Sequence, residues 1–540
     1  MTRLFKTFCV LAAGLLLSAS LLAQTRGFYN VKDFGAKGDG ATLDTEAINK
    51  AILAASAAGG GTVYFPAGKF MSHSIRLKDN ITLHLDQGCI LAAAAPVNGV
   101  GFDAPEPNPW DMYQDFGHSH WQNSLIWGDS ISNIAIIGQG LIDGSAGLSR
   151  GESRTGGVGN KAIALKECHN VLLRDIRMYM CGHFALLATG VDNLTIDNVM
   201  VDTNRDAFDI DCCENVRISN CYINSPNDDG LVLKSSYALG YPKDCDNVTI
   251  TNCSLSGYEI GSLLDGSFKR TVQRAPDQDG PTGRIKFGTE SNGGFRNITI
   301  TNCTFDTSRG FAIETVDGAL IENITFTNVV MRDICNSTFF LRIGGRMRAP
   351  EGFRKSVMRN INISNVLVYN ADPRYSSLIT GLPGQYIENV TLSNIRILYR
   401  GGLSLKDVTE QNQSLVSNFF TRRAEEGPNA ARADAYAVPE RVKDYPEPSA
   451  FGILPAYGFF IRHVKNITLR DVEIGFLNED TRPAVVLVDV QGADMDNLKA
   501  QRAGGAPMFV LRDVKDFTVR NTPGIKNAQI AATAASEITQ

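Results

Sequence analysis

Three carboxylates lie in two short turns of this chain, about 20 residues apart. The first turn reads Asn204-Arg205-Asp206, and the second places Asp228 beside Asp229. Closely spaced carboxylates suit acid–base cleavage of a glycosidic bond, because one stays protonated as the acid while another, ionised, activates a water molecule. Asp is also common in turns, since its side chain accepts hydrogen bonds from nearby backbone N–H groups. The spacing alone leaves both interpretations open, a catalytic set and a pair of acidic turns.

The elements that must position these turns form a sequence repeat. Its pattern is Asn, an aliphatic residue, any residue, an aliphatic residue, any residue, and then Asn or Asp. The copies at Asn170, Asn193 and Asn215 are about 22 residues apart. Further copies begin at Asn247, Asn297, Asn323, Asn389 and Asn466, with variant forms at Asn80, Asn133 and Asn360. Each copy holds two short alternating strands, and one such unit buries its apolar face only by stacking on others.

The repeat predicts an all-β fold, a right-handed parallel β-helix. Asn at one corner of each coil can form a ladder of side-chain hydrogen bonds along the stack. Cys221, Cys253 and Cys303 share another repeat position, which favours a buried ladder of free thiols over disulfides. The competing fold, a leucine-rich repeat horseshoe, would need Leu-rich repeats with a helix, whereas these repeats favour Ile, Val and Thr.

Two segments depart from the repeat. Residues 44–58 predict an amphipathic helix with Asp44 as its N-cap, and we expect it to cover the open end of the stack. Residues 403–457 hold five prolines and many charges, which indicates a long insert loop; folded over one groove end, it would favour exo-cleavage. We therefore expect a single β-helix domain, 24–540, made of the N-terminal cap and first coils (24–150), central coils with the active site (151–402), the insert (403–457) and the C-terminal coils (458–540).

Residues 1–23 predict a secretory signal peptide, since Arg3 and Lys6 precede an apolar run from Cys9 to Leu17. The alternative is a membrane anchor, but this run is short and no later stretch is long enough to span a bilayer. The net charge of -5 argues against a general nucleic-acid binder. We expect a periplasmic or secreted monomer that is free of the membrane after signal cleavage.

Several motifs point to one family. The opening Val31-Lys-Asp-Phe-Gly-Ala-Lys-Gly-Asp-Gly is similar to the N-terminal coil of pectin-active β-helices in general. Gly138-Gln-Gly-Leu-Ile-Asp-Gly, Asn204-x-Asp206 and Asp228-Asp229 resemble the G-x-G-x-I-D-G, N-T-D and D-D motifs of glycoside hydrolase family 28, the polygalacturonase-like pectin hydrolases. The resemblance covers nearly all of the chain after the signal.

This resemblance implies a role for each carboxylate. Asp229 would be the general acid, while Asp206 and Asp228 would hold and activate the water, with inversion at the anomeric carbon. An inverting site needs an acid on one side of the bond and a water-activating carboxylate on the other. Crowded carboxylates raise one another's proton affinity, so one of them can remain protonated.

Two departures from the family concern its basic residues. The strand from Thr282 to Ser291 lacks the family's G-H-G, and Ala312 and Glu314 stand where its R-I-K would hold the substrate carboxylate. Arg284-Ile285-Lys286 carries the same string one coil earlier. If Ile285 faces the core, Arg284 and Lys286 face outward and could rebuild the clamp; the alternative is a solvated face. The departures indicate a decorated or mixed pectin backbone, or exo-action on oligosaccharides.

Further substrate-binding candidates flank the turns. Asn204 precedes Asp206, Lys234 follows the Asp pair by five residues, and His183 lies one coil before Asn204. With Arg284, Lys286 and Glu314 they form the expected binding set, although His183 and Lys234 could equally be structural. The His and Cys residues lack zinc spacing, so neither a metal nor a cofactor is expected.

We therefore expect an exported glycoside hydrolase that cleaves α-glycosidic bonds of a pectin-type polysaccharide or oligosaccharide with galacturonic acid in its backbone. The first alternative is a polysaccharide lyase on the same scaffold, with Arg284 or Lys286 as the base that abstracts the C5 proton. The second alternative is a non-catalytic carbohydrate-binding protein, which the presence of all three Asp residues disfavours.

Overall fold

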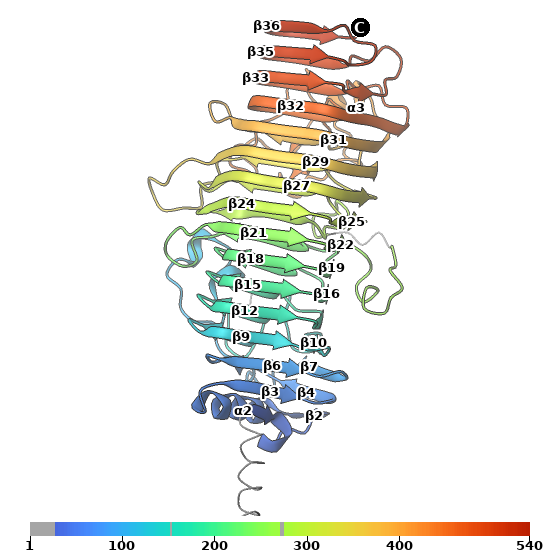
Figure 1. Ribbon diagram of the computed structural model, residues 1–540. Helices are drawn as coiled ribbons and strands as arrows, with labels where there is room; N and C mark the ends of the chain where they lie inside the picture. The colour runs from blue at the N-terminus through green and yellow to red at the C-terminus, as the bar shows by residue number, and fades with distance from the viewer. Residues whose placement is uncertain (1–26, 152–153, 271–274) are drawn as a thin grey trace, which may run out of the picture.

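The computed structural model describes residues 27–151, 154–270 and 275–540, so the expected signal peptide lies outside the described residues. The described chain winds into a stack of coils, with β3 (Gly61–Phe65) near one end and β36 (Ala528–Ile538) at the other (Figure 1). Strands of successive coils pair in parallel, and only β35–β36 pair antiparallel among the named strands. The predicted parallel β-helix is confirmed.

Three strand ladders, A, B and C, run along the stack. Ladder A, labelled along the front of Figure 1, contains β1 (Phe28–Asn30), β3, β6 (Ile81–Leu85), β9 (Ser132–Ile137), β12 (His169–Arg174), β15 (Asp192–Asp197), β18 (Glu214–Ser219), β21 (Cys245–Thr251), β24 (Gly294–Thr301), β27 (Leu320–Arg332), β29 (Val357–Ala371), β31 (Ile387–Gly401), β32 (Phe459–Asn478), β33 (Val485–Asp496), β35 (Phe509–Arg520) and β36. Ladder B contains β2 (Asp39–Leu43), β4 (Gly68–Ser72), β7 (Cys89–Ala93), β10 (Leu141–Asp143), β13 (Arg177–Tyr179), β16 (Met200–Asp202), β19 (Tyr222–Asn224), β22 (Ser254–Ser256) and β25 (Thr304–Asp306), and it continues into the end of β27; the short β34 (Lys499–Ala500) pairs with β32. Ladder C contains β5 (Ile75–Arg76), β8 (Ser124–Asp129), β11 (Lys161–Lys166), β14 (Phe184–Thr189), β17 (Phe208–Asp211), β20 (Leu231–Ser235), β23 (Ile285–Ser291), β26 (Phe311–Thr315), β28 (Phe339–Ile343) and β30 (Ser377–Thr380), and it continues into the start of β32.

The repeated Asn residues form the expected side-chain ladder along ladder A. Asn133 donates to Asn80 at 2.8 Å and Asn193 donates to Asn170 at 2.8 Å. The same contact continues along the stack, for example from Asn360 to Asn323 at 3.2 Å. These residues have positive φ angles near 60°, a conformation that Asn tolerates better than most side chains. One residue type thus makes many of the ladder A corners and ties several coils to the next.

A single hydrophobic core fills the space inside the coils, and the expected Cys ladder is part of it. Cys221, Cys253 and Cys303 are each about 1% exposed. The strands that follow them pair in register, Tyr222 with Ser254 and Ser254 with Thr304, so the three thiols stack. Within the described residues every cysteine is free.

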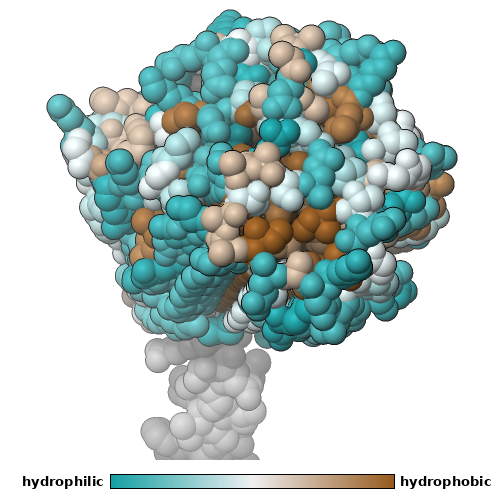
Figure 2. Space-filling model, turned by 90° about the horizontal axis from the view of Figure 1, so that it is seen from above, coloured by the Kyte–Doolittle hydropathy of each residue, from teal (hydrophilic) through white to brown (hydrophobic). Residues whose placement is uncertain are grey.

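The two ends of the stack are built differently. At the N-terminal end, helix α2 (Thr45–Ala57) buries one apolar face in the core after the short η1 (Val31–Phe34). Asp44 precedes α2 but does not cap it with its side chain, contrary to the expectation; its carboxylate accepts instead from the N–H groups of Lys37 and Gly38 at 2.7 and 3.0 Å. At the C-terminal end, seen in Figure 2, apolar and polar residues are mixed on the surface. No helix within the described ranges is long and apolar enough to cross a membrane.

The expected insert lies between β31 and β32 and contains only the short helices α3 (Leu405–Glu410) and η4 (Pro448–Phe451). Apolar insert residues pack on ladder C, and buried arginines of ladder strands fix the insert backbone. Arg342 of β28 donates to the carbonyl of Glu440 at 2.7 Å, and Arg462 of β32 donates to that of Val438 at 2.6 Å. The insert is therefore packed against one face of the stack and fixed there by hydrogen bonds.

Two more short helices, η2 (Asp111–Tyr113) and η3 (Phe116–Ser119), lie on the loop between β7 and β8.

Candidate active site

The three expected catalytic carboxylates meet at the start of two neighbouring strands of ladder C. Phe208 of β17 pairs with Leu231 of β20, and Asp206 and Asp229 each lie two residues before these partners. They therefore occupy the same place in successive coils, with Asp228 adjacent. One oxygen from each of the three carboxylates lies within 4.8 Å of the others.

The next strand of ladder C brings two cations to the same place. Leu231 of β20 pairs with Ile285 of β23, and Ile285 is fully buried in the core. Arg284 and Lys286 therefore face away from the core, as the alternation predicted. The Arg284 Nε donates to Asp229 Oδ1 at 2.8 Å, and the Lys286 Nζ lies 3.6 Å from Asp229 Oδ2. These side chains are 3% and 2% exposed, so the alternative of a solvated face is wrong.

The surroundings of Asp206 and Asp229 differ in charge. Burial would raise the pKa of Asp229, but Lys286 and Arg284 outweigh it and lower this pKa to about 2. Burial and the neighbouring Asp228 raise the pKa of Asp206 well above its usual value. These surroundings therefore favour the ionised form of Asp229 and the protonated form of Asp206. The cations beside Asp229 do not favour the proton that the expected general acid would carry.

Asp228 and Asp229 line a cavity of about 320 Å³ that the insert helps to enclose. Phe419, Phe420, Tyr445 and Glu447 of the insert line it together with Arg205, Asp228, Asp229, Arg284, Lys286 and Arg309. The rings of Phe420 and Tyr445 stack with centroids 4.6 Å apart. The repeat pattern does not predict these insert residues, because the insert has no repeat. Only the aromatic and charged composition of the insert indicated that it lies near the groove.

Glu447 of the insert joins two arginines of ladder C. Its carboxylate accepts from Arg284 Nη2 at 2.9 Å and from Arg309 Nη1 at 2.9 Å. Arg309 also forms two bonds of 2.7 Å to Asp277. Burial would raise the pKa of Glu447, but the two arginines lower it, so Glu447 is ionised. Arg284 is thus held from both sides, by Asp229 and by Glu447.

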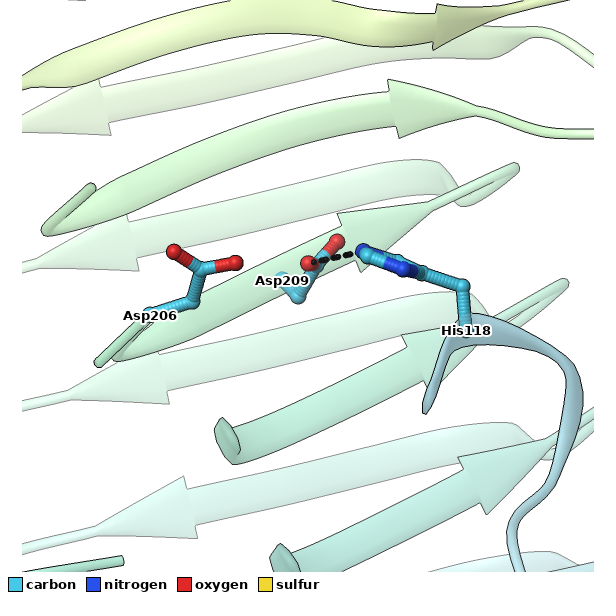
Figure 3. Close-up of side chains that lie close together, drawn as sticks. All are labelled: His118, Asp206 and Asp209. Atoms are coloured by element: carbon cyan, nitrogen blue, oxygen red, sulfur yellow. Dashed lines mark hydrogen bonds and ion pairs between the residues drawn. The ribbon is translucent and has the colours of Figure 1, made fainter. Parts of the chain in front are cut away.

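Lys234 is placed beside the cavity rather than in its wall. Its ammonium group donates to Glu290 at 2.9 Å and to His118 Nε2 at 2.6 Å, and lies 3.6 Å from Asp209. Figure 3 shows Asp209 between Asp206 and His118. The contacts make Lys234 the centre of a buried ion network, so its expected direct contact with substrate is not supported by its position.

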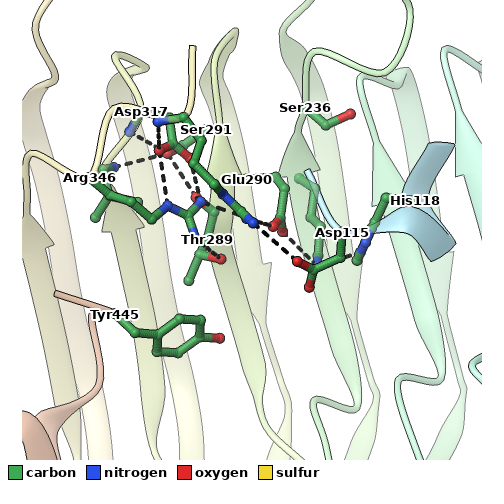
Figure 4. A network of polar contacts seen from close by, with 12 residues as sticks. Asp115, His118, Ser236, Thr289, Glu290, Ser291, Asp317, Arg346 and Tyr445 are labelled. Atoms are coloured by element: carbon green, nitrogen blue, oxygen red, sulfur yellow. Dashed lines mark hydrogen bonds and ion pairs between the residues drawn. The ribbon is translucent and has the colours of Figure 1, made fainter. Parts of the chain in front are cut away.

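The same network extends toward the insert (Figure 4). Arg348 bonds to Glu290 and, at 3.1 Å, to Asp115, and Arg346 pairs with Asp317. Tyr445 lies next to this group of side chains. Buried charges arranged in alternating sign fix the ladder C face on which the carboxylates stand.

Two clusters within the described ranges have the geometry of metal ligands, His118 with Asp206 and Asp209, and Asp206 with Asp228 and Asp229. In the first cluster the Lys234 ammonium already lies among the ligand atoms. In the second, Arg284 and Lys286 already neutralise Asp229. A divalent ion would therefore add charge beside existing cations, and these residues are a poor fit for one.

His183 and Asn204 hold the cavity wall from behind. The fully buried His183 lies with its Nδ1 2.9 Å from Arg205 Nη1. Burial and the nearby Arg205 hold the pKa of His183 well below its usual value, so its neutral ring accepts this hydrogen bond. The carbonyl of Asn204 accepts from Arg150 at 3.0 Å. Both residues contact arginines of the site and position them.

Glu314 is fully buried below Lys286, with its carboxylate 3.5 Å from the Lys286 Nζ. Burial raises the pKa of Glu314 to about 8, although Lys286 opposes the shift. It does not line the cavity. Its expected contact with substrate is therefore replaced by an indirect one through Lys286.

Residues 28–180 match the family model described as rhamnogalacturonase A/epimerase, pectate lyase-like. Residues 110–274, which include all three carboxylates, match the model of glycosyl hydrolases family 28. The resemblance to glycoside hydrolase family 28 is thereby confirmed.

Individual relatives are similar over parts of the chain. The chain is 26% identical over 299 residues to a protein named probable polygalacturonase from Vitis vinifera, covering 51% of this chain and 60% of that protein. It is 32% identical over 175 residues to exo-poly-alpha-D-galacturonosidase from Dickeya chrysanthemi, covering 31% of this chain and 27% of that protein. The chain thus spans less than two thirds of the length of these relatives. Among solved structures, the family 28 exopolygalacturonase of Yersinia enterocolitica shares the fold, with a TM-score of 0.61 and 16% identity over 87% of this chain and 78% of that one.

Proposed function

We propose that this protein is an exported glycoside hydrolase that cleaves α-glycosidic bonds of a pectin-type polysaccharide or oligosaccharide containing galacturonic acid. The observation that carries the proposal is the meeting of Asp206, Asp228 and Asp229 beside one cavity, where the surroundings raise the pKa of Asp206 and lower that of Asp229. The names of the two sequence relatives, a polygalacturonase and an exo-poly-galacturonosidase, support the substrate class.

The charges around the carboxylates suggest a division of roles that differs from the sequence-based one. Asp229, kept ionised by Arg284 and Lys286, takes a proton from the water that attacks the anomeric carbon. Asp206, whose pKa is raised by burial and by the neighbouring Asp228, delivers its proton to the leaving glycosidic oxygen. Asp229 thus becomes the base rather than the acid.

Inversion at the anomeric carbon rests on the family resemblance. The nearest carboxylate oxygens lie within 4.8 Å, closer than the roughly 6.5–9.5 Å typical of carboxyl groups in inverting enzymes. The first anomer released, read by proton NMR within minutes of mixing, tests this part of the mechanism: the β anomer indicates inversion and the α anomer retention.

A lyase is disfavoured because its candidate bases, Arg284 and Lys286, are positively charged. Abstraction of a C5 proton requires a neutral Arg or Lys side chain. The carboxylates around Arg284 and Lys286 raise the pKa of both groups despite their burial, so both remain charged. The insert residues Tyr445 and Glu447 line the cavity, and this position supports cleavage near a chain end, because an insert folded over one groove end favours exo-action.

A product assay tests the proposed function. Wild type and Asp228→Asn are incubated with pectic oligosaccharides, and reducing sugar and ultraviolet absorbance are followed together. We expect reducing sugar without an absorbing C=C product, and a loss of about 10³-fold or more in the variant at unchanged thermal stability. An absorbing product would establish a lyase instead. Reducing sugar release that is equal in both proteins would remove Asp228 from the mechanism.

A further inference from the structure

One arginine of ladder C joins a catalytic carboxylate to the insert. Arg284 is 3% exposed, and its Nε donates to Asp229 Oδ1 at 2.8 Å. Its two terminal nitrogens donate to Glu447 of the insert, Nη2 to Oε2 at 2.9 Å and Nη1 to Oε1 at 3.4 Å. Glu447 is 1% exposed. The guanidinium group of Arg284 is therefore divided between two buried carboxylates, one of the catalytic set and one 163 residues away.

This division decides how Arg284 meets Asp229. A guanidinium group that faces one carboxylate favours a bidentate pair, in which two N–H groups occupy both carboxylate oxygens. In this site Arg284 bonds to Oδ1 alone, and Asp229 Oδ2 faces the Lys286 Nζ at 3.6 Å. Without Glu447, the terminal N–H groups of Arg284 would be buried without their acceptor, which is costly. We expect Arg284 then to turn onto both oxygens of Asp229.

The other carboxyl groups near Arg284 do not replace Glu447. Asp277 is held by two bonds of 2.7 Å from Arg309. Glu314 is fully buried, and burial raises its pKa to about 8, so it is largely protonated at neutral pH. Two more carboxylates line the cavity and have arginine partners of their own, Asp228 with Arg205 at 3.3 Å and Asp115 with Arg348 at 3.1 Å.

The Glu447 carboxylate has a fixed direction. Its Oε1 also accepts from Arg309 Nη1 at 2.9 Å and from Asn336 Nδ2 at 3.3 Å. Glu447 directly precedes η4, whose Phe451 is 1% exposed and packs against Phe340 of β28 with ring centroids 6.3 Å apart. Because this apolar contact anchors η4, removal of the Glu447 carboxylate should leave the path of the insert unchanged.

We infer that Glu447 is a positioning residue for the hydrolysis and that the insert thereby forms part of the catalytic machinery. Glu447 draws the terminal N–H groups of Arg284 away from Asp229, so that the proposed base keeps one oxygen that Arg284 does not cover. The attacking water can then reach this oxygen. The inference rests on the proposed function, and it gives a segment outside the repeat a task in the reaction itself.

The variant Glu447→Ala and its rescue by formate test this inference. We expect kcat for a pectic oligosaccharide to fall by about 100-fold while KM changes less than about threefold, because a misplaced catalytic group acts on the chemical step. Formate is a carboxylate small enough to enter the cavity and pair with Arg284 and Arg309, so it should raise kcat of the variant by about tenfold. Sodium chloride at the same ionic strength should not. A residue that only stabilises the insert would give no such rescue.

Glu410→Ala removes a carboxylate from the exposed surface of helix α3 and is the matched control. It should change neither kcat nor KM, with or without formate. Thermal unfolding shows whether each variant is folded. If Glu447→Ala does not fold, Glu447→Gln, which keeps the volume of the side chain, should show the same fall in kcat at nearly constant KM.

The outcomes separate this inference from the proposed function. A folded Glu447 variant with the wild-type kcat, or a folded Glu447→Ala protein whose kcat formate does not raise, would overturn the positioning role and leave the hydrolase intact. A loss that falls on KM rather than on kcat would overturn it as well. Absence of cleavage by the wild-type protein would instead overturn the proposed function itself.

Discussion

Replacing Lys286 by Met should move the acid limb of the pH–activity profile. Lys286 Nζ lies 3.6 Å from Asp229 Oδ2, and Lys286 is 2% exposed. At an effective dielectric constant of about 20, two unit charges at this distance attract by roughly 4 to 5 kcal/mol, which corresponds to about 3 pKa units. Arg284 remains in place beside Asp229 and burial still opposes its ionisation, so we expect the pKa of Asp229 to rise by about 1 to 3 units.

The acid limb should move to higher pH in Lys286→Met, because the proposed base Asp229 must be ionised to act. Its pKa is lowered to about 2 in the wild-type protein, so Asp229 stays ionised throughout the usual working range. In Lys286→Met, protonation of Asp229 should reduce kcat/KM as the pH falls below about 5 to 3, whereas the wild-type value should persist to lower pH. The assay is kcat/KM for a pectic oligosaccharide from pH 3 to 8, restricted to the range in which fluorescence shows a folded protein.

Lys286→Arg is the matched control, because it keeps the positive charge beside Asp229 and should keep the wild-type acid limb. A Lys286→Met acid limb that coincides with the wild-type limb would refute the reasoning. It would mean either that Lys286 does not set the ionisation of Asp229 or that Asp229 is not the base.

Two further predictions concern residues placed behind the cavity. His183→Phe should raise KM several-fold with a smaller change in kcat, because Arg205 loses the neutral acceptor at 2.9 Å; steady-state kinetics measure both, and an unchanged KM would argue against a positioning role. Glu314→Gln should stabilise the protein most at alkaline pH. The folded pKa of Glu314 is raised to about 8, so its contribution favours folding below the unfolded value near 4.5 and is lost progressively as the pH rises to about 8. Thermal unfolding at pH 5 and pH 8 should show a gain for the variant of a few kcal/mol that is largest at pH 8, and an equal gain at both values would contradict the assignment.

Much of the architecture follows from short-range patterns. The Asn corner, the inward Cys ladder and the alternation of Ile285 between Arg284 and Lys286 each depend on residues only a few positions apart. Because coils of similar length stack in register, the same pattern also predicted that Asp206 and Asp229 meet, although 23 residues separate them. Local periodicity was sufficient for these features because each coil contacts mainly its neighbours.

The charges and ion-pair partners of the site residues depend on contacts that the sequence repeat does not encode. Glu447 reaches Arg284 across 163 residues, from an insert whose path depends on arginines buried in β28 and β32. Lys234 follows the Asp pair as a substrate ligand would, yet Glu290 and His118 draw it into an ion network. Asp206 and Asp229 occupy equivalent repeat positions, yet their pKa values shift in opposite directions. Lys286 and Arg284 lower the pKa of Asp229, whereas burial and Asp228 raise that of Asp206. Sequence by itself thus determined where the carboxylates stand, because stacking is a local property. Only the tertiary structure decided which charged groups surround each of them, because the charge balance in a buried cavity depends on every chain segment that reaches it.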